Sequence, residues 1–335
     1  MRSKQKFERL KGIAPVKFIL IPAISVGIFF AIAFVLILSQ PPKGFVSAET
    51  LDFPEGDPGA SVSDLLTFTA RDGATLGYRD IAGTGSGDMI LVHGSGWHGA
   101  AYEPLAQAIS QRCGYRVIVP DLRGHGPLAD PRGDIAYVGQ LEDDLADLLD
   151  HLGLDRAVFA GHSSGGGLVI RFAGGAHGAR MDRAVLIAPF LKYNAPTATE
   201  GSVWARPLTR RIIGLSMLNA VGIRALNGLT VIEFNLPETV RATEQGQWAT
   251  ASYSHRLNTG YAPRSDYLAD IAALPPYLLL AGSDDAAFRP MEYEPVMSGA
   301  STNGRYEILP GLGHLGILDA AETTEAIAGF LGCPK

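Results

Sequence analysis

The sequence contains very little cysteine and no recognisable set of metal ligands. Its two cysteines, Cys113 and Cys333, lie far apart and form no C-x-x-C pair, which argues against a structural zinc site and a dithiol redox site. There is no H-E-x-x-H motif, and no glycine-rich turn ends in the G-K-[S/T] of a nucleotide-binding loop. We therefore expect neither a metal ion nor an organic cofactor.

Positive charge is scarce after the first forty residues. The whole chain carries a net charge of −6, but residues 1–40 hold six Lys and Arg against one Glu, which leaves −11 on the remainder. An acidic body argues against a nucleic acid as partner. With 47% hydrophobic residues, the composition is otherwise ordinary for a globular protein.

An uncharged apolar run follows the basic N-terminus. Residues 18–38 are 21 consecutive residues without a charge; as a helix they would measure about 31 Å and match a hydrocarbon core of about 30 Å. The pattern predicts a basic cytoplasmic tail over residues 1–17 and a single transmembrane helix over residues 18–38. By the positive-inside rule, the body of the protein is then periplasmic or extracellular.

A cleaved signal peptide is the alternative for this segment, because the small residues Val46, Ser47 and Ala48 follow it. The apolar run exceeds the roughly 7–15 residues usual in signal peptides, which favours the anchor. Residues 39–60 contain four prolines and three glycines and are expected to be a linker. Residues 61–335 remain for one large domain.

This domain has the alternating pattern of an α/β protein. A hairpin is expected over residues 65–80, and short apolar runs predict strands at 89–92, 116–119, 157–160, 184–188, 277–280 and 305–309. The clearest helix falls near residues 138–152, where leucines recur at helical spacing. Such a sequence predicts a mostly parallel sheet covered on both faces. The rhythm breaks over about residues 190–266, which we expect to be an inserted helical cap over the carboxyl ends of the strands.

The most informative motif is Gly161-His162-Ser163-Ser164-Gly165, which matches G-x-S-x-G directly after an expected strand and before an expected helix. This turn is so tight that side chains two positions either side of the serine would collide. The motif also places the serine at a helix N-terminus, where negative charge is favoured. We predict that Ser163 is a catalytic nucleophile; a glycine-rich helix start is the structural alternative.

A glycine-rich turn after an earlier strand supplies a candidate oxyanion hole. In His93-Gly94-Ser95-Gly96 the backbone can aim N–H groups at a developing negative charge. We expect the N–H groups of Ser95 and Ser164 to form that hole, each worth about 2.7–4 kcal/mol in the transition state. A phosphate-binding loop is the alternative reading of the turn.

A serine nucleophile needs a histidine base and a carboxylate that orients it. His314, the last of eight histidines, follows the last expected strand and is the predicted base. The acid should follow the strand before it, where Asp284 and Asp285 are both candidates and Asp285 is favoured. Considered without the histidine, either aspartate could equally belong to a solvated acidic turn.

Three of the other histidines have structural explanations. His93 and His125 are expected to brace loops, and His162 is expected to pack beside the serine. Trp97 and His98 are candidates for lining a substrate pocket.

Three motifs together resemble a known family. His93-Gly94-Ser95-Gly96-Trp97-His98-Gly99, Asp121-Leu122-Arg123-Gly124-His125-Gly126 and Gly161-His162-Ser163-Ser164-Gly165-Gly166 are similar to the serine aminopeptidase-like branch of the α/β-hydrolases, which includes monoglyceride lipases and lysophospholipases. The resemblance covers about residues 65–190 and 270–331. It implies the α/β-hydrolase fold, with the oxyanion position on Ser95 and the acid on Asp285. Ser164 departs from the family, which often has methionine there, and the resemblance does not extend to the cap.

The resemblance implies a serine hydrolase that cleaves carboxylic esters through an acyl-enzyme. An anchored body and an apolar cap favour lipid-like esters such as monoacylglycerols or lysophospholipids, although the apolar residues of the cap could simply form its own core. Acyl transfer or peptide hydrolysis with the same triad, and a membrane-tethered binding module without activity, are the alternatives. In this fold Cys113 and Cys333 would end helices that cover the same face, so an exported body could join them in a disulfide.

Overall fold

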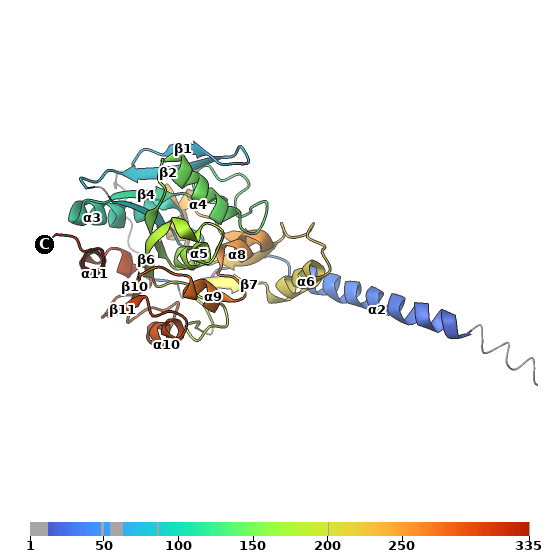
Figure 1. Cartoon of the computed structure of the whole chain (residues 1–335). Helices are drawn as coiled ribbons and strands as arrows, with labels where there is room; N and C mark the ends of the chain where they lie inside the picture. The colour runs from blue at the N-terminus through green and yellow to red at the C-terminus, as the bar shows by residue number, and fades with distance from the viewer. Residues whose placement is uncertain (1–12, 48–49, 54–62, 86, 200, 335) are drawn as a thin grey trace, which may run out of the picture.

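The computed structural model of the chain describes residues 13–47, 50–53, 63–85, 87–199 and 201–334 (Figure 1). The first twelve residues, which hold most of the expected basic tail, lie outside this description, as does Ala48 of the alternative cleavage site. The described residues form an α/β body from which one long helix extends (Figure 1).

The centre of the body is an eight-stranded sheet with the order β1-β2-β4-β3-β5-β6-β10-β11. Antiparallel pairing joins β1 to β2 and β2 to β4, and all other pairs are parallel, so the predicted hairpin and mostly parallel sheet are confirmed. The strands are β1 (Leu66–Thr69), β2 (Thr75–Ile81), β3 (Asp88–Val92), β4 (Arg116–Pro120), β5 (Ala157–His162), β6 (Met181–Ile187), β10 (Tyr277–Gly282) and β11 (Gly304–Leu309).

Helices cover both faces of this sheet, because successive side chains of a buried strand point to opposite sides. Ile90 and Val92 of β3 belong to one buried cluster and Met89 and Leu91 to the other. The first cluster is completed by α4 (Gln140–His151) and α5 (Ser164–Ala173), and the second by α3 (Glu103–Cys113) and α11 (Ala321–Leu331). Short helices α9 (Tyr267–Ala272) and α10 (Tyr293–Ser298) complete the body.

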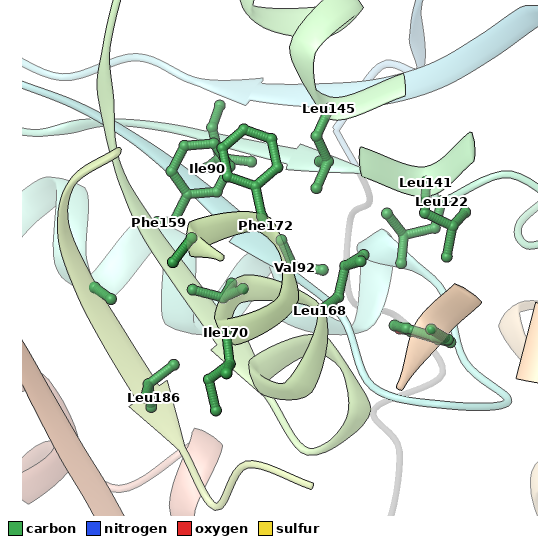
Figure 2. Close-up of a cluster of buried hydrophobic side chains, with 14 of the residues drawn as sticks. Ile90, Val92, Leu122, Leu141, Leu145, Phe159, Leu168, Ile170, Phe172 and Leu186 are labelled. Carbon is green, nitrogen blue, oxygen red and sulfur yellow. The ribbon is translucent and has the colours of Figure 1, made fainter. Parts of the chain in front are cut away.

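Figure 2 shows the packing of the first cluster, in which leucines of α4 and apolar residues of α5 meet strand residues of β3, β5 and β6. The predicted leucine stripe of α4 is confirmed: Leu141, Leu145, Leu148 and Leu149 are all buried. Each such side chain contributes about 1.5–3 kcal/mol by leaving water. The core therefore holds α5 rigidly against the sheet, and with it Ser163, which directly precedes the helix.

The insertion after β6 is not purely helical, so that part of the prediction is wrong. It contains a three-stranded antiparallel sheet of order β7-β8-β9, formed by β7 (Ala205–Pro207), β8 (Thr230–Phe234) and β9 (Ser252–Ser254). β8 contains Thr230, Val231 and Ile232, whose branched side chains favour extended backbone. The helices of the insertion are α6 (Thr209–Ala220), α7 (Glu238–Arg241) and α8 (His255–Tyr261).

The apolar N-terminal run forms helix α2 (Ile13–Leu38), which extends away from the body and ends beside α6 (Figure 1). Ala33 and Ile37 of α2 are buried against Leu215 and Leu218 of α6. Over the residues that the structure describes, no helix is both long enough and apolar enough to cross a membrane. The transmembrane span expected over residues 18–38 stays a prediction.

A disulfide joins Cys113, at the end of α3, to Cys333, which follows α11. The two Cα atoms lie 5.0 Å apart and the cysteines are separated by 220 residues. The hypothesis that these cysteines pair is confirmed, and the bond ties the C-terminus to the first helix of the body.

Candidate active site

Ser163 occupies a sharp turn between β5 and α5. Its φ of 54° and ψ of −123° lie in a region that non-glycine residues rarely adopt. The flanking glycines permit the turn: a Cβ atom at Gly161 would lie 2.5 Å from the carbonyl oxygen of Gly165, and one at Gly165 would lie 2.4 Å from that of His93. The structure therefore has the strained turn that the motif predicts.

His314 and Asp285 meet Ser163 at the carboxyl edge of the sheet. The Nε2 atom of His314 lies 3.0 Å from the Oγ atom of Ser163, and its Nδ1 atom lies 2.8 Å from Oδ2 of Asp285. Ser163 is 6% exposed, His314 is 2% exposed, and the Asp285 side chain is fully buried. The three predicted residues thus form one continuous hydrogen-bonded chain.

The geometry distinguishes Asp285 from its neighbour Asp284. Besides His314, Asp285 accepts hydrogen bonds from the backbone N–H groups of Ala287 and Phe288 at 2.7 and 3.0 Å. Asp284 instead accepts from the hydroxyl of Ser283 at an exposed position. Of the two candidates, Asp285 alone is placed to orient the histidine.

The turn after β3 lies directly beside the serine, since a Cβ atom at Gly94 would lie 3.3 Å from Cβ of Ser163. The N–H of Gly94 donates to the hydroxyl of Tyr102 at 2.8 Å, and the N–H of Gly96 donates to that of Tyr253 at 2.5 Å. Between them, the backbone N–H of Ser95 has no partner among the described residues, and neither has that of Ser164 at the start of α5. These two donors are free to bind an oxyanion.

The same turn has the glycine spacing G-x-G-x-x-G at Gly94, Gly96 and Gly99, which is typical of dinucleotide sites. Here, however, all three glycine N–H groups already donate to side chains of the protein. Those of Gly94 and Gly96 donate to tyrosine hydroxyls, as described above, and that of Gly99 donates to Asp121 at 2.7 Å. None of the three glycine N–H groups is therefore free to bind a phosphate.

Tyr102 and His162 connect the three loops of the site. The Tyr102 hydroxyl lies 2.8 Å from Nδ1 of His162, whose Nε2 lies 2.9 Å from the carbonyl oxygen of His314. Tyr102 therefore donates to His162, and His162 donates to the backbone of the base loop. Burial lowers the pKa of His162 well below its ordinary value, so the ring stays neutral and can accept from Tyr102. His162 packs beside the serine as expected.

His93 and His125 brace loops, as expected. Nδ1 of His93 donates to the carbonyl oxygen of Gly94 at 2.8 Å, and its Nε2 accepts from the N–H of Leu122 at 3.1 Å. His125 accepts from the Tyr253 hydroxyl at 2.6 Å. Burial lowers the pKa of His93 to about 4. Among the described residues, no three His, Cys, Asp or Glu side chains are grouped so that they could hold a metal ion.

His98 does not line an open pocket. It is fully buried, its Nε2 lies 3.0 Å from the carbonyl oxygen of Gln245 in the insertion, and its ring stacks on Trp97. Burial lowers its pKa to about 3. The expectation for His98 is therefore corrected: it joins the insertion to the body. Trp97, which is partly buried, remains available to the site.

Two residues of the insertion reach the site without any signal in the sequence. Tyr253 holds Gly96, and the indole N–H of Trp204 donates to the Ser95 hydroxyl at 2.9 Å. They stand 157 and 109 residues from their partners, so no local spacing could have shown the contact.

Known proteins resemble this chain over most of its length. The family model described as "Alpha/beta hydrolase family" matches residues 89–326. The non-heme haloperoxidase of Rhodococcus erythropolis is 30% identical over 269 residues, which are 73% of this chain and 91% of that protein.

Solved structures show the same fold. A thermophilic esterase from Thermogutta terrifontis is 25% identical with a TM-score of 0.57 and covers 81% of this chain and 98% of its own. A membrane phospholipase A, described as a bacterial virulence factor, is 18% identical with a TM-score of 0.59 and covers 95% and 97% of the two chains. The relatives are haloperoxidase- and esterase-like, and the narrower serine aminopeptidase-like branch stays a prediction.

Proposed function

The chain belongs to the alpha/beta hydrolase family, and on that premise we propose that it is a serine hydrolase that cleaves carboxylic esters through an acyl-enzyme. The observation that carries the proposal is the hydrogen-bonded chain from Ser163 through His314 to Asp285, at 3.0 and 2.8 Å. It is the arrangement that turns a serine hydroxyl into a nucleophile.

In the proposed reaction, Ser163 Oγ attacks the ester carbonyl carbon while its proton passes to Nε2 of His314. The N–H groups of Ser95 and Ser164 stabilise the oxyanion of the tetrahedral intermediate. His314 then returns the proton to the departing alcohol, which leaves an acyl group on Ser163. Water attacks this acyl-enzyme with His314 as base, and the carboxylic acid is released. Throughout, Asp285 accepts a hydrogen bond from the Nδ1–H of His314 and keeps the imidazole in place.

Labelling with a fluorophosphonate tests the proposal without knowledge of the substrate, because the reagent phosphonylates an activated serine. We expect labelling of the purified protein and none of Ser163→Ala. Ser164→Ala is the matched control: it removes the rival hydroxyl but keeps the backbone N–H, so labelling should persist. Labelling that survives Ser163→Ala would overturn the assignment of the nucleophile, and an unlabelled wild-type protein would favour a binding module.

We propose lipid-like esters, such as monoacylglycerols or lysophospholipids, as substrates. The support is the apolar surroundings of the site: Trp204 bonds to Ser95, and the ring of Phe288 lies 5.2 Å from that of His314. A panel of esters of increasing acyl length should show kcat/KM rising beyond the butyrate ester. Activity confined to acetyl and propionyl esters would rule out this class. Product analysis with and without an alcohol acceptor separates hydrolysis from acyl transfer.

We further propose that the N-terminal segment tethers the protein to a membrane, with the N-terminus cytoplasmic and the body outside. Its support is the 21-residue uncharged run after a basic tail and the large exposed side chains on α2, including Ile24, Val26 and Val35. The protein should stay with the membrane fraction after alkaline carbonate extraction. Release into the soluble fraction, with a new N-terminus near residue 49, would support a cleaved signal instead.

A further inference from the structure

A short stretch of the expected linker lies against the candidate active site. Residues 51–53, which we term the strap, precede the first strand of the body and carry no regular structure. Leu51 is only 4% exposed, which is unusual for a flexible connection. The strap therefore makes specific contacts rather than running free through solvent.

Asp52 contacts the loop that carries the proposed base. Its Oδ1 atom accepts from the N–H of Leu315 at 2.9 Å, and its Oδ2 atom accepts from the N–H of Gly316 at 2.8 Å. On the other side of His314, a Cβ atom at Gly313 would lie 2.2 Å from Oδ2 of Asp52. A single carboxylate thus bonds two backbone N–H groups that follow His314 and lies close against Gly313, which precedes it.

Phe53 extends an aromatic surface beside the oxyanion turn. Its ring centroid lies 6.0 Å from that of Trp97 and 5.8 Å from that of Trp204. Trp204 in turn donates to the Ser95 hydroxyl, and the neighbouring Gly94 lies against Ser163. The three rings form an apolar wall beside Ser95, in the turn whose Gly94 lies against Ser163.

Contacts further up the chain hold the segment before the strap on the insertion. The backbone N–H groups of Lys43 and Gly44 donate to Glu233 of β8 at 3.0 and 2.5 Å. The guanidinium of Arg206 lies 5.5 Å from the centroid of the Phe45 ring, a favourable cation–π arrangement. The described segment that precedes the strap in the chain is thus fixed on the insertion.

We propose that the strap is a working part of the hydrolase site, an inference that rests on the proposed function. Asp52 is a positioning residue that fixes the loop of His314 through the two backbone N–H groups. Phe53 is a specificity-determining residue that completes the wall for the apolar portion of the ester. The bonds of Asp52 constrain the base to within reach of Ser163, and misplacement of a catalytic group by about 1 Å can cost about 100-fold in rate.

Asp52→Ala and Asp52→Asn test the positioning role. The alanine variant removes both acceptor oxygens, whereas the amide of asparagine keeps one. We expect kcat and the fluorophosphonate labelling rate to fall at least fivefold in Asp52→Ala. Both should fall by a smaller factor in Asp52→Asn. KM should stay within twofold. Asp64→Asn is the matched control, since it removes the same charge from an exposed position before β1. A loss of thermal stability with unchanged kcat and labelling rate would overturn the role.

Phe53→Ala tests the wall. We expect kcat/KM for long-chain esters to fall at least fivefold, mainly through KM, while short-chain esters change less than twofold; Phe53→Leu should recover part of the loss. Phe45→Ala is the control, because its ring stacks on Arg206 and is not part of the wall. An unchanged ratio of long- to short-chain kcat/KM would overturn the assignment.

Failure of this inference is distinguishable from failure of the proposed function. If wild-type protein is labelled at Ser163 and the strap variants behave like it, the strap has no role but the hydrolase stands. If wild-type protein is neither labelled nor active on any ester, the proposed function itself fails.

Discussion

The carboxylate of Asp285 lies 2.8 Å from Nδ1 of His314, and both side chains are almost fully buried. The second carboxylate oxygen is occupied by two backbone N–H groups, so the aspartate cannot rotate away. A buried acceptor held in this way fixes the tautomer of the histidine that leaves Nε2 free to take a proton.

Asp285→Asn should therefore lower kcat about 10⁴-fold. The amide can turn its N–H donor towards Nδ1 of His314, which selects the tautomer with the proton on Nε2, and that tautomer cannot accept a proton from Ser163. Asp284→Asn is the matched control and should stay within twofold of wild type. Ester hydrolysis by the purified variants measures both. Equal losses in the two variants would contradict the assignment of Asp285 as the acid.

Tyr253→Phe should lower kcat about tenfold, because the N–H of Gly96 loses its acceptor and the oxyanion turn loosens beside Ser95. His125 loses its donor in the same variant, so we also expect a modest decrease in stability, about 1–3 kcal/mol. Tyr277→Phe is the comparison: its hydroxyl bonds Tyr306, away from the site. Ester kinetics that do not differ between the two variants would show that Tyr253 has no influence on the turn.

Gly165→Ala should abolish activity and reduce the yield of folded protein, since the added Cβ would lie 2.4 Å from the backbone carbonyl oxygens of both Val92 and His93. Gly329→Ala is its control. Gly329 lies within α11 with no atom within 4 Å of an added Cβ, and alanine there should be neutral or stabilising by up to about 1 kcal/mol. Circular dichroism and thermal melts measure both variants, and a fully active Gly165→Ala would refute the close approach.

Removal of the disulfide by Cys113→Ser with Cys333→Ser should cost about 2–5 kcal/mol of stability, because the bond closes a long loop of the unfolded chain. Chemical denaturation of the wild type with and without reductant should reproduce the same difference. The wild-type protein should also resist thiol alkylation until it is unfolded and reduced. Alkylation of both thiols in the native protein would show that the bond is absent.

Acid should destabilise the protein through its buried histidines. Burial lowers the pKa of His93 to about 4 and of His98 to about 3, and it lowers those of His125 and His162 well below the ordinary value. A depressed folded-state pKa gives stability that is present above the unfolded pKa of about 6.5 and is lost as the pH falls towards the folded pKa.

Each of these histidines should lower the free energy of unfolding by about 1.4 kcal/mol per pH unit below pH 6.5. Urea denaturation at several pH values between 7 and 4.5 measures how steeply the free energy of unfolding falls. His98→Gln should lower that slope by the contribution of one histidine, about 1.4 kcal/mol per pH unit, while its amide still donates to the carbonyl oxygen of Gln245. A free energy of unfolding that does not change over this interval would contradict neutral burial of the rings.

Local patterns in the sequence were sufficient to predict the sheet, the helices that cover it and the position of the nucleophilic serine. Apolar runs, a leucine stripe and a glycine-flanked serine each act within a few residues, because backbone geometry and close approach are decided there. The order of serine, acid and base along the chain also followed from the fold that the motifs resemble. The sequence favoured Asp285 as the acid, but either aspartate alone could have belonged to a solvated turn, because only the tertiary structure shows which of the two side chains faces the interior.

Tertiary structure alone decided the contacts between distant segments. Asp52 and Leu315 are separated by 263 residues, and Tyr253 and His125 by 128. Neither contact has a local signature, because it depends on how the insertion and the N-terminal segment pack over the sheet. The same packing placed His98 against Gln245 and the strap against the base loop. The sequence by itself determined the chemistry at the edge of the sheet, and the packing of remote segments determined what surrounds it.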